Sequence, residues 1–402
     1  MADRKTDPDR PLEGIRVVDI ATFIAGPFAA CLLADFGAEV IKAEMPGEGD
    51  SLRQMGPVYN GGSFWWSVDN RNKKCITLDL RKPKGQEIVK RLVEQADVLV
   101  ENFRPGTLER WGIGYDVLSR VNPRLVMARI SAFGQTGPYR ERPGFATVAD
   151  AMGGLQYMTG FPDLPPIRPG MAVPDYLTGV FTAFAIMMAI HYRDKTGRGQ
   201  YIDSALYESI FRITEYTAGA YGKLGQVRER TGISRTGAPG SVYQTSDGKW
   251  VGISTPNDRL FARLAAAMGR AELATDPRYA TGQARMERRE ETNGIVADWV
   301  AKHTAKEVVD KLEQAEVPCA PVYSIADIFA DPHYQAREMV ATVDDPVLGE
   351  INMPGVVPKM SLTPGRIAWS APPMGAHNED VYCGLLGYSA EELERLKVDG
   401  VV

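Results

Sequence analysis

The chain contains few cysteines and few histidines, with four of each among its 402 residues. The cysteines are scattered, and no two of them form a C-x-x-C pair. Neither a disulfide framework nor a redox motif is therefore expected. With so few of the usual ligands present, we also expect no metal site.

An excess of charge of either sign is also absent, because 46 Lys and Arg face 51 Asp and Glu, for a net charge of −5. That balance argues against a general attraction to nucleic acid or to an anionic membrane. Hydrophobic residues make up 44% and charged residues 24%, as in an ordinary globular protein. The N-terminal residues MADRKTDPDRP are polar and contain no hydrophobic signal region, so we expect a cytoplasmic location.

Long apolar runs are lacking except at residues 176–192. This run is interrupted by Thr178, Gly179, Thr182 and His191, and it is shorter than the roughly 20 residues that cross a bilayer. We therefore expect a fully buried helix of a large protein, and no membrane association.

The first half of the chain repeats a strand–helix–strand pattern. Residues 15–20 predict a buried strand, residues 28–36 predict a helix preceded by Gly26-Pro27, and residues 38–43 predict the next strand. Such repeated units build a parallel sheet, so we expect a doubly wound α/β domain. The later predicted elements are strands at 75–80, 97–101, 124–131 and 201–204, and helices at 83–95 and 116–121.

The pattern changes near residue 225. Residues 241–255 predict a hairpin that turns at Ser246-Asp247-Gly248. Together with the segments that follow, this predicts a smaller α+β domain. Those segments are helices at 258–268, 285–302 and 305–315, a strand at 319–323, and, in the tail, helices at 377–386 and 390–396.

Three segments carry residues suited to chemistry, each with a purely structural alternative. The loop of residues 23–27 follows the first strand, where open parallel sheets bind ligands, but its single glycine does not make a dinucleotide fingerprint. Asn102, Phe103 and Arg104 follow another strand, and could bind a purine edge, stack on a ring and bind phosphate; a solvated loop is the alternative. Asp175 begins the apolar helix, either as an N-terminal cap or as a nucleophile.

Taken together, the sequence resembles the class III coenzyme A (CoA) transferase family, which includes formyl-CoA:oxalate and carnitine CoA-transferases. The resemblance spans nearly the whole chain. It depends on LEGIRVVD at 12–19, AGP at 25–27, LLADFGAEVIKAE at 32–44, NRNKK at 70–74, ADVLVENFRPG at 96–106, KTGRGQ at 195–200 and VPCAPV at 317–322.

The resemblance implies a large Rossmann-like domain built from both ends of the chain, a small α+β domain, and a homodimer of interlocked subunits. We expect the large domain at 1–205 and 340–402, the small domain at 225–330, and linkers at 206–224 and 331–339. Assembly with a different subunit is the alternative to the homodimer.

The resemblance also assigns site residues by their place in the motifs. Asp175 matches the nucleophilic aspartate of the family, Gly237 and Gly240 belong to a segment that resembles a shortened glycine loop, and Phe145 stands where related racemases have a histidine. Apart from the resemblance, Trp65 belongs to an aromatic cluster that could line the substrate cavity or pack in the core. The expected CoA contacts are Phe23, Ile24, Ala25, Leu78, Arg81, Asn102, Phe103, Arg104, Thr107 and Arg110.

The implied reaction is transfer of CoA from an acyl-CoA donor to a small carboxylic acid. It would pass through an aspartyl anhydride and an aspartyl-CoA thioester, with CoA as substrate and no tightly bound cofactor. Ile24 stands where oxalate-specific relatives have glutamine, so oxalate is not expected, whereas nearby basic residues suit succinyl-CoA as donor. Two alternatives stay open: an acyl-CoA racemase or epimerase, although Phe145 replaces its histidine, and a CoA-binding subunit without activity.

Overall fold

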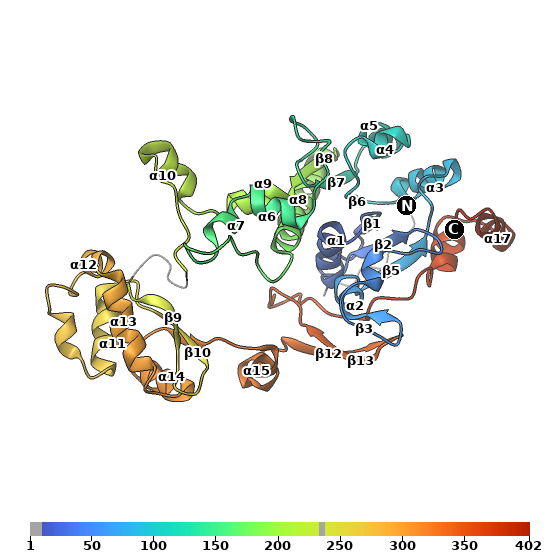
Figure 1. Cartoon of the computed structure of the whole chain (residues 1–402). Coiled ribbons are helices and arrows are strands. Elements are labelled where there is room, and N and C mark those ends of the chain that lie inside the picture. Colours follow the sequence, from blue (N-terminus) through green and yellow to red (C-terminus); the bar gives the residue numbers. More distant parts are fainter. Residues whose placement is uncertain (1–9, 233–237) are drawn as a thin grey trace. The chain divides into compact units, whose positions relative to one another are not determined.

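The computed structural model describes residues 10–232 and 238–402, which form two compact units (Figure 1). Each unit is assembled from separate stretches of chain, so the second interrupts the first. Unit 1 comprises the chain up to Leu155 with Arg168–Gly225 and Gln335–Val402, and unit 2 comprises Gln156–Ile167 and Gln226–Tyr334.

Unit 1 is built on a six-stranded sheet in the order β5-β2-β1-β6-β7-β8, in which all neighbouring pairs are parallel. The predicted α/β class is therefore confirmed. The strands are β1 (Arg16–Asp19), β2 (Glu39–Glu44), β5 (Lys73–Thr77), β6 (Val98–Glu101), β7 (Val126–Ser131) and β8 (Gln200–Ala205).

Helices cover both faces of this sheet because alternate strand residues point to opposite sides (Figure 1). Val18 packs in one core with α3, α5 and the C-terminal helices, whereas Val17 packs in the other with α1 and α8. The helices of unit 1 that bear on the sheet and the site are α1 (Ala25–Asp35), α2 (Phe64–Asp69), α3 (Pro83–Glu94), α4 (Thr107–Arg110), α5 (Tyr115–Val121), α6 (Ala146–Met152), α8 (Val173–Thr196), η3 (Glu379–Leu385) and α17 (Ala390–Val398).

Strand β5 begins at Lys73, two residues before the predicted start at Cys75. The first two residues of β5 are lysines, which are not typical of a buried strand, so the sequence pattern did not indicate where the strand begins. Lys73 is nevertheless fully buried, because its Nζ donates to Asp19 Oδ2 at 2.9 Å and to Asn70 Oδ1 at 2.8 Å.

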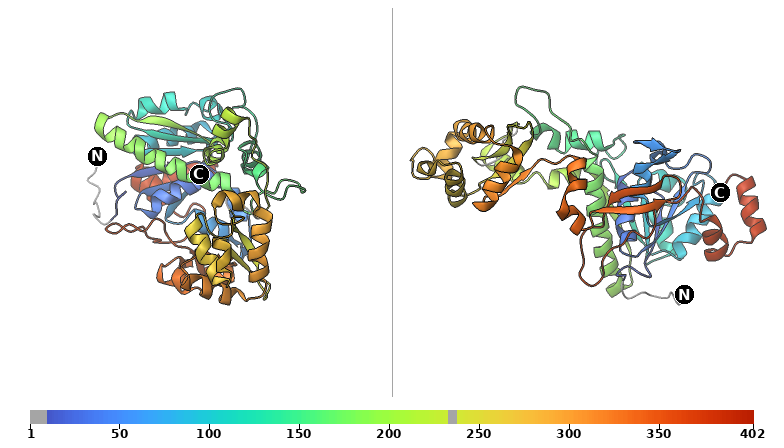
Figure 2. Two further views of the ribbon diagram at one scale, coloured as in Figure 1. Left: turned by 90° about the vertical axis from the view of Figure 1, so that its left-hand side faces the viewer. Right: turned by 90° about the horizontal axis from the view of Figure 1, so that it is seen from below.

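Helix α8 was predicted to be fully buried, and this prediction is wrong for a single copy of the chain. One face packs on α1 and on strands β7 and β8, while Phe184 is 61% exposed on the other. Among the described residues α8 is long and apolar enough to span a bilayer, and one of its faces packs on the sheet (Figure 2). Its exposed apolar side chains include Phe181, Phe184, Met188 and Tyr192.

The C-terminal helices η3 and α17 pack beside β5, although they lie about 300 residues later. The Tyr382 hydroxyl donates to the Thr77 carbonyl at 2.6 Å, and the Asp79 N–H donates to the Val401 carbonyl at 2.8 Å. Two hairpins of this unit were not predicted, because they are short and largely exposed: β3 (Val58–Tyr59) with β4 (Gly62–Ser63), and β12 (Val340–Asp345) with β13 (Gly349–Pro354).

Unit 2 has an antiparallel sheet in the order β11-β10-β9, and the predicted hairpin is confirmed. The single helix predicted at 285–302 is instead two, broken at Arg288. Arg285 is buried there and donates to the carbonyls of Ala238 and Tyr279. The main elements are β9 (Gly240–Gln244), β10 (Trp250–Ser254), β11 (Cys319–Pro321), α11 (Asp258–Ala267), α12 (Gly282–Glu287), α13 (Arg289–Val300) and α14 (Ala305–Gln314).

The boundaries of the units differ from the expected linkers. The residues expected to link the domains at 206–224 form α9 (Leu206–Arg212) and α10 (Thr217–Leu224) within unit 1. Residues 156–167, expected in the large domain, group with unit 2. The short helices α7 (Leu155–Met158) and α16 (Pro332–Ala336) lie at the crossings between units, and α15 (Ile325–Ala330) precedes the second of these.

Candidate functional site

The loop after β1 is held in one conformation by buried polar groups. The Ala21 N–H donates to Asp19 Oδ1 at 3.1 Å, and the Phe23 N–H donates to Asp50 Oδ1 at 3.2 Å. Phe23 has a φ of 70°, which is uncommon for a residue with a side chain and costs roughly 1–3 kcal/mol. Lys42 stabilises the strained loop. Its fully buried Nζ lies 3.2 Å from Asp50 Oδ2 and donates to the Ala21 carbonyl.

Asn102 joins this loop to the end of the neighbouring strand β6. Its Oδ1 accepts from the Thr22 N–H at 2.8 Å, and its Nδ2 donates to the Thr22 carbonyl at 2.6 Å. The two predicted loops therefore lie side by side at the carboxyl end of the sheet. Phe103 packs edge-on against Trp111, with ring centroids 5.3 Å apart.

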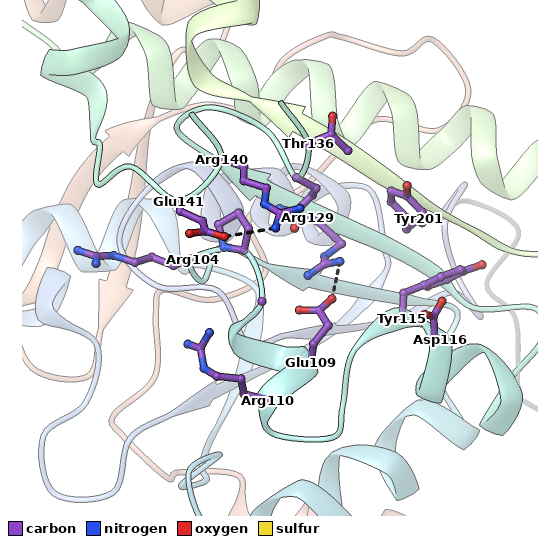
Figure 3. Close-up of a pocket in the computed structure, with 13 residues that line it drawn as sticks. Arg104, Glu109, Arg110, Tyr115, Asp116, Arg129, Thr136, Arg140, Glu141 and Tyr201 are labelled. Carbon is purple, nitrogen blue, oxygen red and sulfur yellow. Dashed lines mark hydrogen bonds and ion pairs between the residues drawn. The ribbon is translucent and has the colours of Figure 1, made fainter. Parts of the chain in front are cut away.

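A cavity of about 710 Å³ is lined by residues that follow β6, by Arg129 of β7 and by Tyr201 near the start of β8 (Figure 3). Arg129 is fixed in its wall by Glu101 Oε1 and Glu109 Oε1, both at 2.8 Å. Burial is the main cause that raises the pKa of Glu101 to about 7, against the opposing effect of Arg129. Two further arginines, Arg104 and Arg110, present exposed guanidinium groups, so the cavity suits a polyanion.

Asp175 lies in the first turn of α8 and is only 8% exposed. Burial raises the pKa of its carboxyl group to about 6, although Arg168 lowers the pKa, and the nearby carboxylate of Asp150 raises it further. Thr178, one turn later on α8, is fully buried, and its hydroxyl has no hydrogen-bond partner among the described residues. The carboxylate is therefore poorly solvated, which makes it more basic than an exposed aspartate.

Aromatic side chains surround the start of α8. Trp65 Nε1 donates to Asp69 Oδ2 at 2.9 Å, and the Tyr176 hydroxyl donates to the same oxygen at 3.0 Å. Burial is the main cause that raises the pKa of Asp69 to about 6. Phe23 and Phe145 have ring centroids 6.1 Å apart, so these two predicted site residues also meet.

Helix α1 packs closely against the first turns of α8. A Cβ atom added to Gly179 would lie 3.0 Å from the Ala25 carbonyl oxygen and 2.9 Å from Phe28 Cδ1. Phe28 also packs edge-on against Tyr176, with centroids 4.8 Å apart. The close approach that Gly179 permits thus holds Asp175 near the loop that precedes α1.

The other predicted site residues lie in varied surroundings. Ile24 and Leu78 are each 2% exposed, and Ala25 is 3% exposed, so little of these side chains is accessible. Arg81 is exposed and pairs with Asp79 at 2.9 Å. The remaining residues are Thr107, whose hydroxyl accepts from Arg110 Nη2 at 3.0 Å, Gly240, which begins β9 of unit 2, and Gly237, which lies outside the described residues.

Several residues around Asp175 were not singled out from the sequence. Asp150 lies on α6 within a run of small residues, and a lone acid there is the one available signal. Arg168 follows a proline-rich segment without periodicity, and Tyr176 is one of sixteen tyrosines. Tyr176 follows Asp175 directly in the sequence, whereas only the fold brings Asp150 and Arg168 close to Asp175.

Comparison with known proteins gives consistent matches along the whole chain. Residues 12–378 match the sequence profile of CoA-transferase family III. The succinyl-CoA–D-citramalate CoA-transferase of Chloroflexus aurantiacus is 46% identical over 98% of this chain and 99% of its own length. The beta subunit of succinyl-CoA–L-malate CoA-transferase from the same organism is 47% identical over 98% of both chains.

A solved structure agrees with these matches. The crystal structure of a CAIB/BAIF family protein from Brucella suis superimposes with a TM-score of 0.82 at 34% sequence identity. The alignment covers 93% of this chain and 99% of that one.

Proposed function

The chain belongs to CoA-transferase family III, and from this premise we propose that it moves CoA from succinyl-CoA to a second carboxylic acid by way of Asp175. Succinyl-CoA is the donor in the names of both Chloroflexus relatives at 46–47% identity. The observation that carries the mechanism is the buried carboxylate of Asp175 in the first turn of α8.

The proposed reaction begins with attack by a carboxylate oxygen of Asp175 on the thioester carbonyl carbon. The C–S bond breaks, CoA leaves as a thiolate, and a mixed anhydride remains. The thiolate then attacks the aspartyl carbonyl carbon, which releases succinate and leaves an aspartyl-CoA thioester. The acceptor carboxylate attacks that thioester to form a second anhydride, and the returning thiolate takes the acyl group and restores Asp175.

Each intermediate retains the activation of the original thioester, so no other energy source is needed. Water would hydrolyse all of these intermediates, and the burial of Asp175 limits its access. The N-terminus of α8 adds a partial positive charge beside the developing oxyanion.

We assign the phosphates of CoA to the arginine-rich cavity at the ends of β6 and β7 (Figure 3). Arg104 and Arg110 offer exposed guanidinium groups there, which suit a diphosphate or a 3′-phosphate. Asn102 and Phe103 border the same strand end and suit the adenine ring or the pantetheine arm. CoA would bind as a substrate, and the cytoplasm is the expected location.

The direct test is to incubate the purified protein with succinyl-CoA and a panel of mono- and dicarboxylic acids, and to identify the CoA products by mass spectrometry. Asp175→Ala should abolish transfer, whereas Asp298→Ala, on the exposed face of α13, should retain it. Hydroxylamine should trap an aspartyl hydroxamate at position 175 in the unaltered protein. Near-normal transfer by Asp175→Ala would refute the mechanism.

We also propose that two copies of this chain associate through α8. Its exposed apolar side chains follow one helical face, and Phe184 and Met188 are each more than half exposed. Light scattering should give a dimer, and Phe184→Glu should weaken it. A monomer at micromolar concentration would contradict this proposal.

A heteromeric assembly is the second candidate, favoured by the relative that is named as a beta subunit. Activity of the purified chain without any partner would exclude a silent subunit. Deuterium exchange at the α-carbon of an acyl-CoA, without any acceptor acid, would instead favour a racemase.

A further inference from the structure

Arg168 and Asp150 form an ion pair near Asp175 that the mechanism above does not use. We propose that Arg168 binds the free carboxylate of a dicarboxylic acyl group held at Asp175, and so selects dicarboxylic over monocarboxylic acids. This inference rests on the proposed function and adds the residue that determines its specificity. Asp150 is then a positioning residue that holds the guanidinium in place.

The geometry of the pair leaves one side of Arg168 available. Its Nε lies 3.1 Å from Asp150 Oδ2, while its Nη1 and Nη2 make no hydrogen bond with the described residues. The Arg168 side chain is 41% exposed, whereas that of Asp150 is fully buried. A guanidinium anchored through Nε can still offer its two terminal nitrogens to a second carboxylate in a bidentate pair.

The ion pair of Arg168 and Asp150 lies close enough to Asp175 to act on its charge. Among the charged groups that act on Asp175, Arg168 is the cation and Asp150 is the other anion. A succinyl group attached at Asp175 carries its free carboxylate two methylene groups from the reacting carbonyl. A nearby cation with free donors is therefore the partner that such an acyl group requires.

The charge balance favours this contact once the covalent bond has formed. Before attack, Arg168 is close to two carboxylates, those of Asp150 and Asp175. Acylation removes the charge of Asp175, because an anhydride or a thioester is neutral. Arg168 then faces Asp150 alone, so a substrate carboxylate binds more favourably to the intermediate than to the free enzyme. An interaction that strengthens along the reaction raises the rate as well as the affinity.

The buried carboxylate of Asp150 supports this arrangement. Its Oδ1 has no hydrogen-bond partner among the described residues, so Arg168 is the contact that compensates its charge. Because Asp150 is inaccessible, it cannot meet the substrate itself. Its effect on specificity should pass through the orientation of Arg168.

The test compares succinyl-CoA with butyryl-CoA, which has a methyl group where succinyl-CoA has its carboxylate. Arg168→Gln should lower kcat/KM for succinyl-CoA about 10- to 100-fold, the usual weight of a hydrogen bond to a charged group, and should leave butyryl-CoA within about threefold. Arg168→Lys retains the charge and should give an intermediate ratio. Arg124→Gln, which breaks a surface pair with Asp194 at 3.4 Å, is the matched control and should change neither rate.

Three outcomes would overturn the inference. Equal loss with both thioesters would mean that Arg168 acts on folding or on the common chemistry. An unchanged preference for succinyl-CoA in Arg168→Gln would mean that another cation binds the carboxylate. If the unaltered protein transferred neither acyl group and formed no hydroxamate, the proposed function would fail first.

Discussion

Replacement of Asp175 by asparagine should make the protein more stable while it abolishes CoA transfer. The amide has nearly the same shape as the carboxylate and carries no charge. Burial raises the pKa of this carboxyl group from 3.8 to about 6, so ionisation of the folded state at neutral pH is unfavourable. The difference between these two pKa values corresponds to about 3 kcal/mol, which is an upper limit for the gain in Asp175→Asn.

The sign of the pH dependence follows from proton binding. The folded protein binds the Asp175 proton more tightly than the unfolded chain does, so the native state loses stability as the pH rises from 3.8 to about 6. The advantage of Asp175→Asn should therefore be complete at pH 7.5. It should be about half as large at pH 5 and about one fifth as large at pH 4, and it should vanish near pH 3.

Urea denaturation of both proteins at pH 7.5 and pH 5 measures these differences. Thermal unfolding at pH 7.5 should show a rise of up to about 4 °C in the midpoint. Asp298→Asn, which alters an exposed carboxylate on α13, is the matched control and should change stability by less than about 0.5 kcal/mol. A loss of stability in Asp175→Asn, or an equal gain at both pH values, would refute the argument that burial opposes the charge.

Three further predictions concern the same unit. The rate of CoA transfer at low substrate concentration should fall about tenfold per pH unit below pH 6, because Asp175 must be ionised to attack. Initial rates between pH 5 and 8 measure this dependence. A flat profile would count against Asp175 as the nucleophile. Gly179→Ala should lower the free energy of unfolding in urea by about 1–3 kcal/mol and slow CoA transfer, because its Cβ would contact α1. Gly222→Ala in α10, with no atom within 4 Å, should be neutral or stabilising by up to about 1 kcal/mol. Equal effects of the two substitutions would contradict this packing. Arg71→Met should cost about 3–5 kcal/mol, because it leaves the carboxylate of Asp35 buried without the guanidinium that lies 2.6 Å away, and a cost below 1 kcal/mol would show that the pair is dispensable.

The sequence predicted the parts of the fold that depend on local periodicity. The strands at the centre of the sheet and helix α3 were expected within a few residues of their observed bounds, because their apolar residues recur with the period of a strand or of an amphipathic helix. The start of β5 was missed because Lys73 is neutralised by Asp19, a partner 54 residues away. A local pattern carries no information about such a partner.

The candidate site was predictable only where motifs mark it. The position of Asp175 before an apolar helix drew attention, but its burial depends on packing against α1, which no local pattern shows. Asp150 and Arg168 are 18 residues apart in the sequence, on a short helix and an irregular segment. Their pairing is a consequence of tertiary structure.

The interrupted construction of unit 1 has a consequence for synthesis on the ribosome. Tyr382 covers the edge strand β5 but is 305 residues from its partner Thr77, and unit 2 is made between them. The hydrophobic surface beside β5 therefore stays exposed until unit 2 and the C-terminal helices have been synthesised. During that interval the nascent chain presents an unfinished surface to chaperones, and it becomes fully native only after almost all of it has been translated.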